Sequence, residues 1–188
     1  MTDDREAMRQ RLLARREALP AQWRRRADAR IVAALEPRLA EAGFECFGVF
    51  LPVRAEPDLS ALYGQLRQRG ARLALPRVAG RGRALEFGYW SEQVAVVPGT
   101  FGIGVPQPFE PALPEALIVP CVGFDRRGFR LGYGGGYYDI TLAERSVAAL
   151  GVAYACCEIA NFEVQRHDRA LDIVCTERGC VGAGFRRR

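Results

Sequence analysis

Residues 116–122 read Ala-Leu-Ile-Val-Pro-Cys-Val, and residues 128–139 read Gly-Phe-Arg-Leu-Gly-Tyr-Gly-Gly-Gly-Tyr-Tyr-Asp. The first run is apolar and predicts a strand, and the glycine cluster is followed by a helix-compatible stretch over residues 137–150. A strand, a glycine loop and a helix start in this order present backbone N–H groups to a phosphate. Arg130 adds a cation beside the loop. The alternative is a tight turn that needs glycine only for geometry, although a plain turn rarely combines so many glycines with such charges.

Outward from this segment, the sequence patterns alternate between helix and strand. Apolar residues at helical spacing predict helices over residues 4–18, 23–39 and 59–68, the last with Asp58 as its N-cap. Short β-favouring runs predict strands over residues 44–51, 72–75, 85–90, 152–157 and 171–176. The Gly- and Pro-rich residues 97–114 predict a long ordered loop.

This alternation predicts an α/β fold: a mostly parallel central sheet flanked by helices, in a single compact domain with an N-terminal helical segment. We assign residues 1–40 to the N-terminal helices, residues 44–180 to the α/β body and residues 186–188 to a basic tail. Parallel sheets of this class bind ligands beyond the carboxyl ends of their strands. The glycine loop follows one predicted strand, and Glu56 follows another, so both are expected at that edge.

The composition is that of a globular protein. The chain has 188 residues, of which 49% are hydrophobic, so it is long enough to bury a substantial core. No apolar run approaches the roughly 20 residues that a membrane-spanning helix needs. The first residues are charged and no apolar segment follows them, so we expect no secretory signal and a cytoplasmic location.

The cysteines are expected to be reduced thiols of the core. Most of them sit inside apolar runs, and none forms a C-x-x-C pair. This pattern favours free thiols over a disulfide framework or a zinc site. The six cysteines are Cys46, Cys121, Cys156, Cys157, Cys175 and Cys180.

All 27 basic residues are arginine, which excludes mechanisms that depend on a lysine nucleophile, a Schiff base or a P-loop lysine. Arginine binds oxyanions through a planar, always charged fork. Residues 1–30 hold nine arginines against five acids, so this segment could bind nucleic acid. Because no aromatic residues are interleaved with the charges, a solvated, salt-bridged helix face is favoured, and we expect no nucleic-acid partner.

The glycine cluster does not match the common nucleotide motifs. G-x-x-x-x-G-K-[ST] is absent, and G-x-G-x-x-G fails because Tyr137 takes the third glycine position after Gly132 and Gly134. No G-x-S-x-G and no Ser/His/Asp arrangement is evident. The residues alone therefore indicate phosphate binding without a P-loop or a dinucleotide site.

Phe124, Asp125 and Gly128, with the gapless run over residues 130–139, closely resemble the signature of the 5-formyltetrahydrofolate cyclo-ligases, also called methenyltetrahydrofolate synthetases. The similarity extends over nearly the whole chain, from the arginine-rich N-terminal helix to residues 167–177.

The resemblance implies an enzyme that uses ATP and Mg²⁺ to convert 5-formyltetrahydrofolate into 5,10-methenyltetrahydrofolate, releasing ADP and phosphate. The partners are then the folate substrate and ATP, with no membrane, and we expect a monomer. A nucleotide-binding paralogue that acts on another substrate, or has a regulatory role, is the alternative.

Carried over by position, the resemblance assigns the site residues. Arg130 and Asp139 would be catalytic, and Asp139 and Asp168 would hold the metal. ATP would contact Arg5, Arg9, Arg130, Leu131, Gly132, Tyr133, Gly134, Gly135, Gly136, Tyr137 and Tyr138. Folate would contact Leu51, Glu56, Tyr133, Gly134, Gly135, Gly136 and Tyr137, with the Glu56 carboxylate accepting adjacent pterin N–H donors.

Several of these residues also have plainer interpretations. Asp139 could cap its helix, Asp168 could be an ordinary loop acid, Glu56 could be solvated, and Arg9 could be surface charge. Family members often have lysine where this chain has Arg5, a change that keeps the charge and alters the geometry.

Overall fold

The computed structural model describes residues 2–160, 162–182 and 184–185, so the predicted basic tail lies outside the described residues. The helices are α1 (Thr2–Glu17), α2 (Ala21–Ala42), α3 (Ser60–Gln68) and α4 (Tyr137–Glu144), with short 3₁₀ turns η1 (Thr100–Gly102) and η2 (Ala155–Cys157). The strands are β1 (Cys46–Gly48), β2 (Arg72–Val78), β3 (Leu85–Trp90), β4 (Ala95–Pro98), β5 (Gly104–Gln107), β6 (Pro111–Ala112), β7 (Ala116–Pro120), β8 (Gly123–Phe124), β9 (Arg130–Leu131), β10 (Ala148–Val152), β11 (Ile173–Thr176) and β12 (Gly179–Gly182).

The central sheet confirms the predicted fold class. Within the described chain its eight strands follow the order β12-β11-β10-β7-β1-β2-β3-β6. Strands β11, β10, β7, β1 and β2 run parallel, and at the two sides β12 pairs antiparallel with β11, β3 with β2, and β6 with β3. The chain order reverses between β1 and β7, since β2 lies on one side of β1 and the later parallel strands lie on the other. Open α/β sheets bind ligands at such a switch point, outside the carboxyl ends of the strands.

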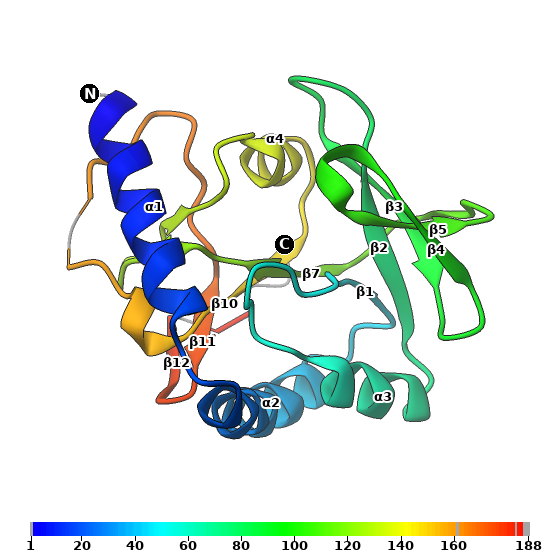
Figure 1. Cartoon of the computed structure of the whole chain (residues 1–188). Helices are drawn as coiled ribbons and strands as arrows, with labels where there is room; N and C mark the ends of the chain where they lie inside the picture. The colour runs from blue at the N-terminus through cyan, green and yellow to red at the C-terminus, as the bar shows by residue number, and fades with distance from the viewer. Residues whose placement is uncertain (1, 161, 183, 186–188) are drawn as a thin grey trace.

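Helices cover both faces of this sheet (Figure 1). Helices α2 and α3 lie below it in that view, and α4 lies above it. Along β7, Ile118 packs into the cluster shared with α2 and α3, whereas Leu117 and Val119 pack into the cluster that α4 covers. A strand that is buried on both faces has a continuous apolar sequence, which is why residues 116–122 predict β7 well.

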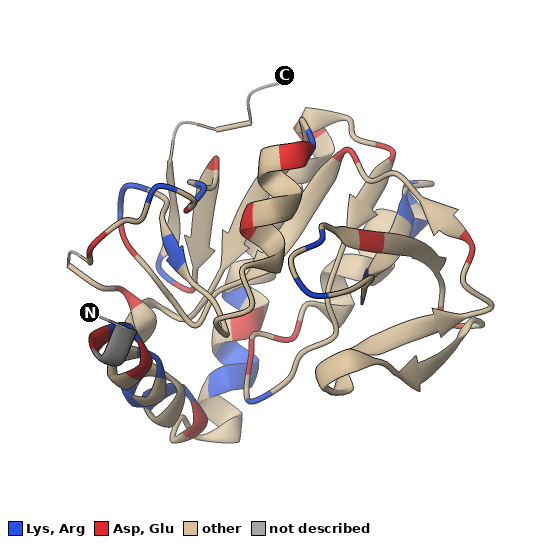
Figure 2. Cartoon of the chain, turned by 90° about the horizontal axis from the view of Figure 1, so that it is seen from above, with Lys and Arg blue, Asp and Glu red and all other residues tan. Residues whose placement is uncertain are grey.

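Helix α1 stands beside the sheet and reaches up to the level of α4 (Figure 1). Its Leu12 and Leu13 are buried against Val122, which precedes β8, and Leu131, which lies in β9 of the small β8–β9 hairpin. Basic and acidic residues are interspersed along the helix (Figure 2). The apolar stripe of α1 therefore fixes β9, and with it the start of the glycine loop.

The predicted helix over residues 137–150 is wrong in its second half. Helix α4 ends at Glu144, and residues 148–152 form β10, buried along its whole length between β7 and β11. The strand predicted over residues 152–157 is also wrong, because β10 ends at Val152 and residues 155–157 form η2. A short apolar run buried on both sides has no period that separates a strand from a helix.

The long loop predicted over residues 97–114 is also wrong. The segment contains most of a hairpin, in which β4 pairs with β5 around η1, and it ends in the edge strand β6. Phe101 at the hairpin tip has a left-handed backbone (φ 60°) and is 76% exposed. Glycine and proline here mark the turn and the edge strands rather than an absence of strands.

The expectation of six free thiols is wrong for one pair. Cys175 and Cys180 lie opposite each other on the antiparallel strands β11 and β12 and form a disulfide. Cys46, Cys121, Cys156 and Cys157 are free. The spacing of cysteines in the sequence could not show that a tight turn between β11 and β12 places Cys175 beside Cys180.

Two smaller findings complete the fold. The Asp58 carboxylate accepts a hydrogen bond from the Ser60 backbone N–H at 2.9 Å, so it caps α3 from one residue before the structural N-cap, Leu59. Among the described residues, no helix combines the length and the hydrophobicity needed to cross a bilayer.

Candidate active site

The glycine loop, residues 132–136, connects β9 to α4 beside the carboxyl end of β7. Gly134 and Gly136 have positive φ (100° and 67°), and Gly136 is the N-cap of α4 without any side-chain cap. Within the described chain, no backbone N–H of residues 132–136 donates a hydrogen bond to another residue. Together with the first turn of α4, these N–H groups form a concentrated set of unpaired donors, which suits an anion.

Arg9 of α1 lies against this loop. Its Nε donates to the Gly132 carbonyl at 2.7 Å, and it forms an ion pair with Glu6 on the same helix. A methyl group added at Gly134 would lie 3.5 Å from the Arg9 guanidinium. The structure thus brings Arg9 to the predicted phosphate loop and gives the loop a positive neighbour.

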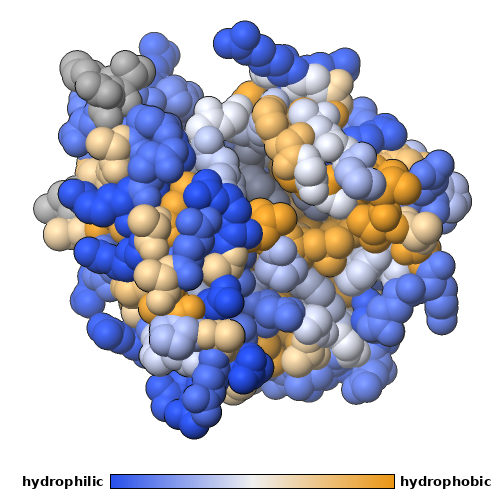
Figure 3. All heavy atoms as spheres, in the orientation of Figure 1, coloured by the Kyte–Doolittle hydropathy of each residue, from blue (hydrophilic) through white to orange (hydrophobic). Residues whose placement is uncertain are grey.

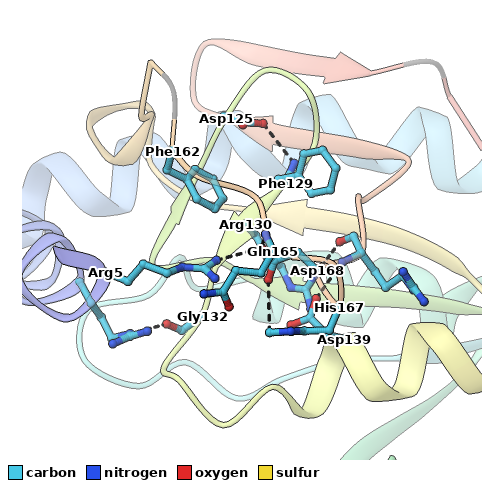
Figure 4. Close-up of polar contacts among 12 residues, drawn as sticks. Arg5, Asp125, Phe129, Arg130, Gly132, Asp139, Phe162, Gln165, His167 and Asp168 are labelled. Atoms are coloured by element: carbon cyan, nitrogen blue, oxygen red, sulfur yellow. Dashed lines mark hydrogen bonds and ion pairs between the residues drawn. The ribbon is translucent and has the colours of Figure 1, made fainter. Parts of the chain in front are cut away.

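Arg130 and Asp139 meet across the loop, at the positions predicted to be catalytic. Arg130 is buried, and its Nη2 lies 3.1 Å from Asp139 Oδ1 while its Nη1 donates to the Arg169 carbonyl at 2.9 Å. Asp139 Oδ1 also accepts from the Arg169 backbone N–H at 3.0 Å. Figure 4 shows these side chains converging from β9, α4 and the segment before β11.

Asp168 closes the same cluster from the segment before β11 (Figure 4). Its Oδ2 accepts from Arg5 Nη2 at 3.1 Å and from the Gln165 backbone N–H at 2.7 Å. The Arg5 guanidinium also lies over the Phe162 ring, 5.4 Å from its centroid, and Arg5 Nε is buried with no acceptor among the described residues. Arg5 therefore joins α1 to Asp168 and keeps one donor unused.

The Asp139 and Asp168 carboxylates suit a divalent cation, because each has an oxygen atom that could coordinate it. Asp139 Oδ2 has no hydrogen-bond partner within the described chain, and Asp168 Oδ1 has only His167 Nε2 at 3.9 Å. Mg²⁺ is commonly held by one or two carboxylates together with substrate phosphates and water. No group of three or more His, Cys, Asp or Glu side chains suited to a metal is present in the described residues, so phosphate oxygens would have to complete the set.

The Glu56 turn, residues 53–56, follows β1 on the other side of the switch point. Glu56 is 5% exposed, and its carboxylate accepts from the Tyr133 hydroxyl at 2.7 Å and from the Val53 backbone N–H at 3.0 Å. Burial raises the pKa of Glu56, while those two hydrogen bonds and the nearby Arg16 charge act to lower it. The solvated interpretation of Glu56 is therefore wrong.

Aromatic and apolar residues complete the site. Tyr137 and Tyr138 pack at the edge of the cluster beneath α4, and burial raises the pKa of Tyr138 above its usual range, so it remains a phenol. The Phe101 ring lies 6.1 Å from the Tyr137 ring, which brings the hairpin tip next to the glycine loop. Leu51 is half-buried, and a methyl group on Gly104 of β5 would lie 3.1 Å from it.

This face of the molecule is hollowed between α1 and the hairpin tip (Figure 3). Other hollows lie between α2 and β12 and along the β4–β5 hairpin, and residues 132–136 line neither of them. The predicted site residues thus gather at one place, away from these two hollows.

A model of the 5-formyltetrahydrofolate cyclo-ligase family matches residues 1–177 of this chain. The chain belongs to the 5-formyltetrahydrofolate cyclo-ligase family. The resemblance noted in the sequence is confirmed, and the chain is an enzyme of this family.

Relatives of the family support the assignment. A 5-formyltetrahydrofolate cyclo-ligase of Mycolicibacterium smegmatis is 33% identical over 146 residues, covering 70% of this chain and 74% of that protein. One from Escherichia coli K12 is 33% identical over 138 residues, covering 68% and 75%. The NMR structure of Aquifex aeolicus 5,10-methenyltetrahydrofolate synthetase superposes with a TM-score of 0.82 at 26% identity, covering 95% of this chain and 92% of that one. A synthetase from Mycoplasma pneumoniae shares the fold, with a TM-score of 0.77 at 22% identity and coverages of 93% and 99%.

The sequence interpretation missed Arg16, which has the largest fully buried side chain among the residues that the structure describes. Its guanidinium lies between the glycine loop and the Glu56 turn. The helical spacing of Arg5, Arg9 and Arg16 places all three on the face of α1 that carries Leu12. This helical spacing could have pointed to Arg16 in the sequence, because a basic residue on the apolar face of a helix needs hydrogen-bond partners in the protein interior.

Proposed function

We propose that this chain catalyses the ATP- and Mg²⁺-dependent ring closure of 5-formyltetrahydrofolate to 5,10-methenyltetrahydrofolate, with release of ADP and phosphate. Family membership supports the cyclo-ligase reaction. The observation that carries the nucleotide part is the set of unpaired backbone N–H groups over residues 132–136, flanked by Arg9 and Arg130.

The chemistry explains why a triphosphate is needed. A formyl oxygen is a poor leaving group. Its attack on the γ-phosphorus breaks the bond to ADP, which leaves, and makes the oxygen part of an imidate phosphate. The neighbouring anilino nitrogen then attacks the activated carbon and loses its proton, the ring closes, and phosphate leaves with the oxygen. The protein has to align the formyl oxygen with the γ-phosphate and neutralise the charge that spreads over the transferring group.

The described residues are suited to both tasks. Backbone N–H groups of residues 132–136 and the first turn of α4 would bind the phosphates, and Arg130 would lie at the transferring group. Asp139 and Asp168 would hold Mg²⁺ through their free oxygens, and the ion would supply charge neutralisation at the phosphates.

The folate side would be built from Leu51, Glu56 and Tyr133. The Tyr133 hydroxyl donates a hydrogen bond to one Glu56 oxygen. A carboxylate accepts at about four lone-pair sites, so Glu56 keeps capacity for pterin N–H donors while the Tyr133 hydroxyl stays bound.

The direct test is an absorbance assay. Purified, folded protein with 5-formyltetrahydrofolate, ATP and Mg²⁺ is expected to produce the methenyl absorbance band, and omission of ATP is expected to remove it. A folded sample that binds both substrates and shows no rise in absorbance would reject the proposed reaction.

The alternative is a nucleotide-binding member of the family that acts on another substrate or regulates. Both functions predict ATP binding at the glycine loop, so ATP binding does not separate them. Calorimetry with 5-formyltetrahydrofolate does, because only the cyclo-ligase requires saturable binding that weakens in Glu56→Ala. We further expect a cytoplasmic monomer without a nucleic-acid partner; Arg5, Arg9 and Arg16 turn toward the body of the protein.

A further inference from the structure

Arg16 occupies the space between the two halves of the proposed site. Its side chain is fully buried, and each nitrogen of the guanidinium donates to a different segment of the chain. Nε donates to the Arg54 carbonyl at 2.9 Å, Nη1 to the Cys121 carbonyl at 3.3 Å and Nη2 to the Tyr133 hydroxyl at 2.6 Å. One cation from α1 thus joins the segments that follow β1, β7 and β9.

The Glu56 turn needs such support, because its backbone is strained. Arg54 and Ala55 both adopt left-handed φ values, 48° and 58°, which are strained for non-glycine residues. The turn closes on itself, with the Glu56 N–H donating to the Val53 carbonyl at 2.9 Å. The contact from Arg16 to the Arg54 carbonyl holds the strained part of that turn.

The same guanidinium reaches Glu56 through Tyr133. Arg16 Nη2 lies 3.9 Å from Glu56 Oε1, and the Tyr133 hydroxyl bridges them, since it accepts from Arg16 and donates to Glu56 at 2.7 Å. Tyr133 belongs to the glycine loop, so this bridge is a direct link from the phosphate-binding segment to the turn that carries Glu56.

We propose that Arg16 is a positioning residue that holds the glycine loop and the Glu56 turn in register, so that nucleotide and folate meet in alignment. The inference rests on the proposed function and adds to it a residue that touches neither substrate. Its effect on catalysis follows from the sensitivity of bound reactants to small displacements. Because each of its three nitrogens donates to a group around the site, loss of the guanidinium leaves the Arg54 carbonyl, the Cys121 carbonyl and the Tyr133 hydroxyl without this partner.

Electrostatics gives this role a signature that a merely structural residue would lack. The titratable groups that face Glu56 are Arg16 from α1, Tyr133 from the glycine loop, Tyr138 from α4, Tyr63 from α3 and Cys121 after β7. Burial raises the pKa of each of these phenols and of the thiol, so they remain neutral. Arg16 is the cation of this described set, and its removal shifts the pKa of Glu56 upward.

The test is a double-mutant cycle on kcat/KM for 5-formyltetrahydrofolate with Arg16→Met, Tyr133→Phe and the double variant. We expect each single variant to lose about ten- to hundredfold, the double variant to lose much less than the product, and the acid limb of the pH profile to move to higher pH. Arg15→Met is the matched control: this neighbour on α1 is exposed and donates to the Cys156 carbonyl, and its profile should stay unchanged.

Independent losses in the cycle, or an unmoved acid limb in both single variants, would overturn the proposal. If Arg16→Met does not fold, the acid limb of the pH profile of Tyr133→Phe is the deciding measurement. The Tyr133 ring is partly exposed, so its variant should fold, and its hydroxyl also lowers the pKa of Glu56. Hydrogen exchange makes the test independent of turnover. In Arg16→Lys, the hydrogen-bonded backbone N–H of Glu56 should exchange faster than in wild type, with no change in Arg15→Met. Wild type without turnover would refute the proposed function, whereas unchanged exchange at Glu56 would refute the role of Arg16.

Discussion

The two sides of the site are built in opposite ways. At the glycine loop, backbone N–H groups have no acceptor in the described chain, and Arg5 keeps a buried donor unused. At the Glu56 turn, the carboxylate is buried and already accepts from Tyr133 and Val53. The first side has free donors for an anion, whereas the second would have to admit a ligand to a carboxylate that is already buried and partly paired. We therefore predict that preorganised donors set the affinity for nucleotide and that access to the buried Glu56 carboxylate limits the affinity for folate.

The largest effect is expected where the glycine-loop side does chemistry. Asp139→Asn keeps an oxygen for the Arg169 N–H and removes the charge that would hold Mg²⁺ and that pairs with Arg130. We expect turnover in the absorbance assay to fall at least about 100-fold, while folate binding by calorimetry is retained. Glu144→Gln, an exposed position on the same helix, is the control. Turnover within twofold of wild type would remove Asp139 from the metal site.

Glu56→Gln is expected to impair the proposed folate side of the site without affecting the glycine loop. The amide still accepts one hydrogen bond and loses the charge that pterin N–H donors would meet. We expect kcat/KM for 5-formyltetrahydrofolate to fall about ten- to hundredfold with KM for ATP unchanged, measured by steady-state kinetics with each substrate varied in turn. Equal rises in both KM values would show that the two sides are not separable.

Substitutions at two glycines compare the glycine loop, which we propose binds ATP, with helix α3, which packs against the sheet. Gly134→Ala places a side chain on a left-handed residue facing Arg9, which costs about 1–2 kcal/mol and should weaken ATP binding roughly tenfold as the loop N–H groups tilt. Gly64→Ala in the middle of α3 meets nothing within 4 Å, so it should stabilise the fold by about 0.4–1 kcal/mol and leave ATP affinity unchanged.

Urea denaturation and ATP calorimetry on the two variants check both numbers. A Gly134→Ala protein that binds ATP like wild type would show that the loop tolerates a changed backbone.

The smallest effect is a pH dependence of stability. Because burial raises the pKa of Glu56 in the folded state, the fold favours the protonated carboxyl. Its stabilising contribution is complete below the unfolded pKa near 4.5 and is lost as the pH rises through the folded value. The free energy of unfolding of wild type minus that of Glu56→Gln should therefore decrease as the pH rises above 4.5, in a series of urea titrations. A difference that stays flat or increases would contradict the burial of this group.

The sequence predicted the fold class where local pattern and burial agree. The run over residues 116–122 and the glycines after it mark β7 and the loop, since burial on both faces and positive φ each demand particular residue types. Residues 148–152 were misjudged, because a short buried strand carries no period of its own. The β4–β5 hairpin was missed because its pairing depends on the partner strand rather than on local composition.

The site divides in the same way. The resemblance of residues 130–139 to a family signature predicts a phosphate loop, and the structure shows backbone N–H groups without acceptors there. Glu56, predicted for the folate side, is hydrogen-bonded to Tyr133 of that loop, and its role stays a prediction. Arg16 was missed because its partners are backbone carbonyls and a hydroxyl from distant segments, and no local pattern encodes those contacts. The pairing of Arg5 with Asp168 likewise joins residues 163 positions apart.

The most direct measurement is an NMR titration of the isotopically labelled protein with ATP and Mg²⁺, following the backbone N–H signals of residues 132–136. These donors are free in the structure, so their signals should shift together and saturate at one affinity, while the N–H signals of α3 stay in place. Saturable ATP binding that leaves the signals of residues 132–136 unmoved would contradict the account, since the triphosphate would then be bound elsewhere.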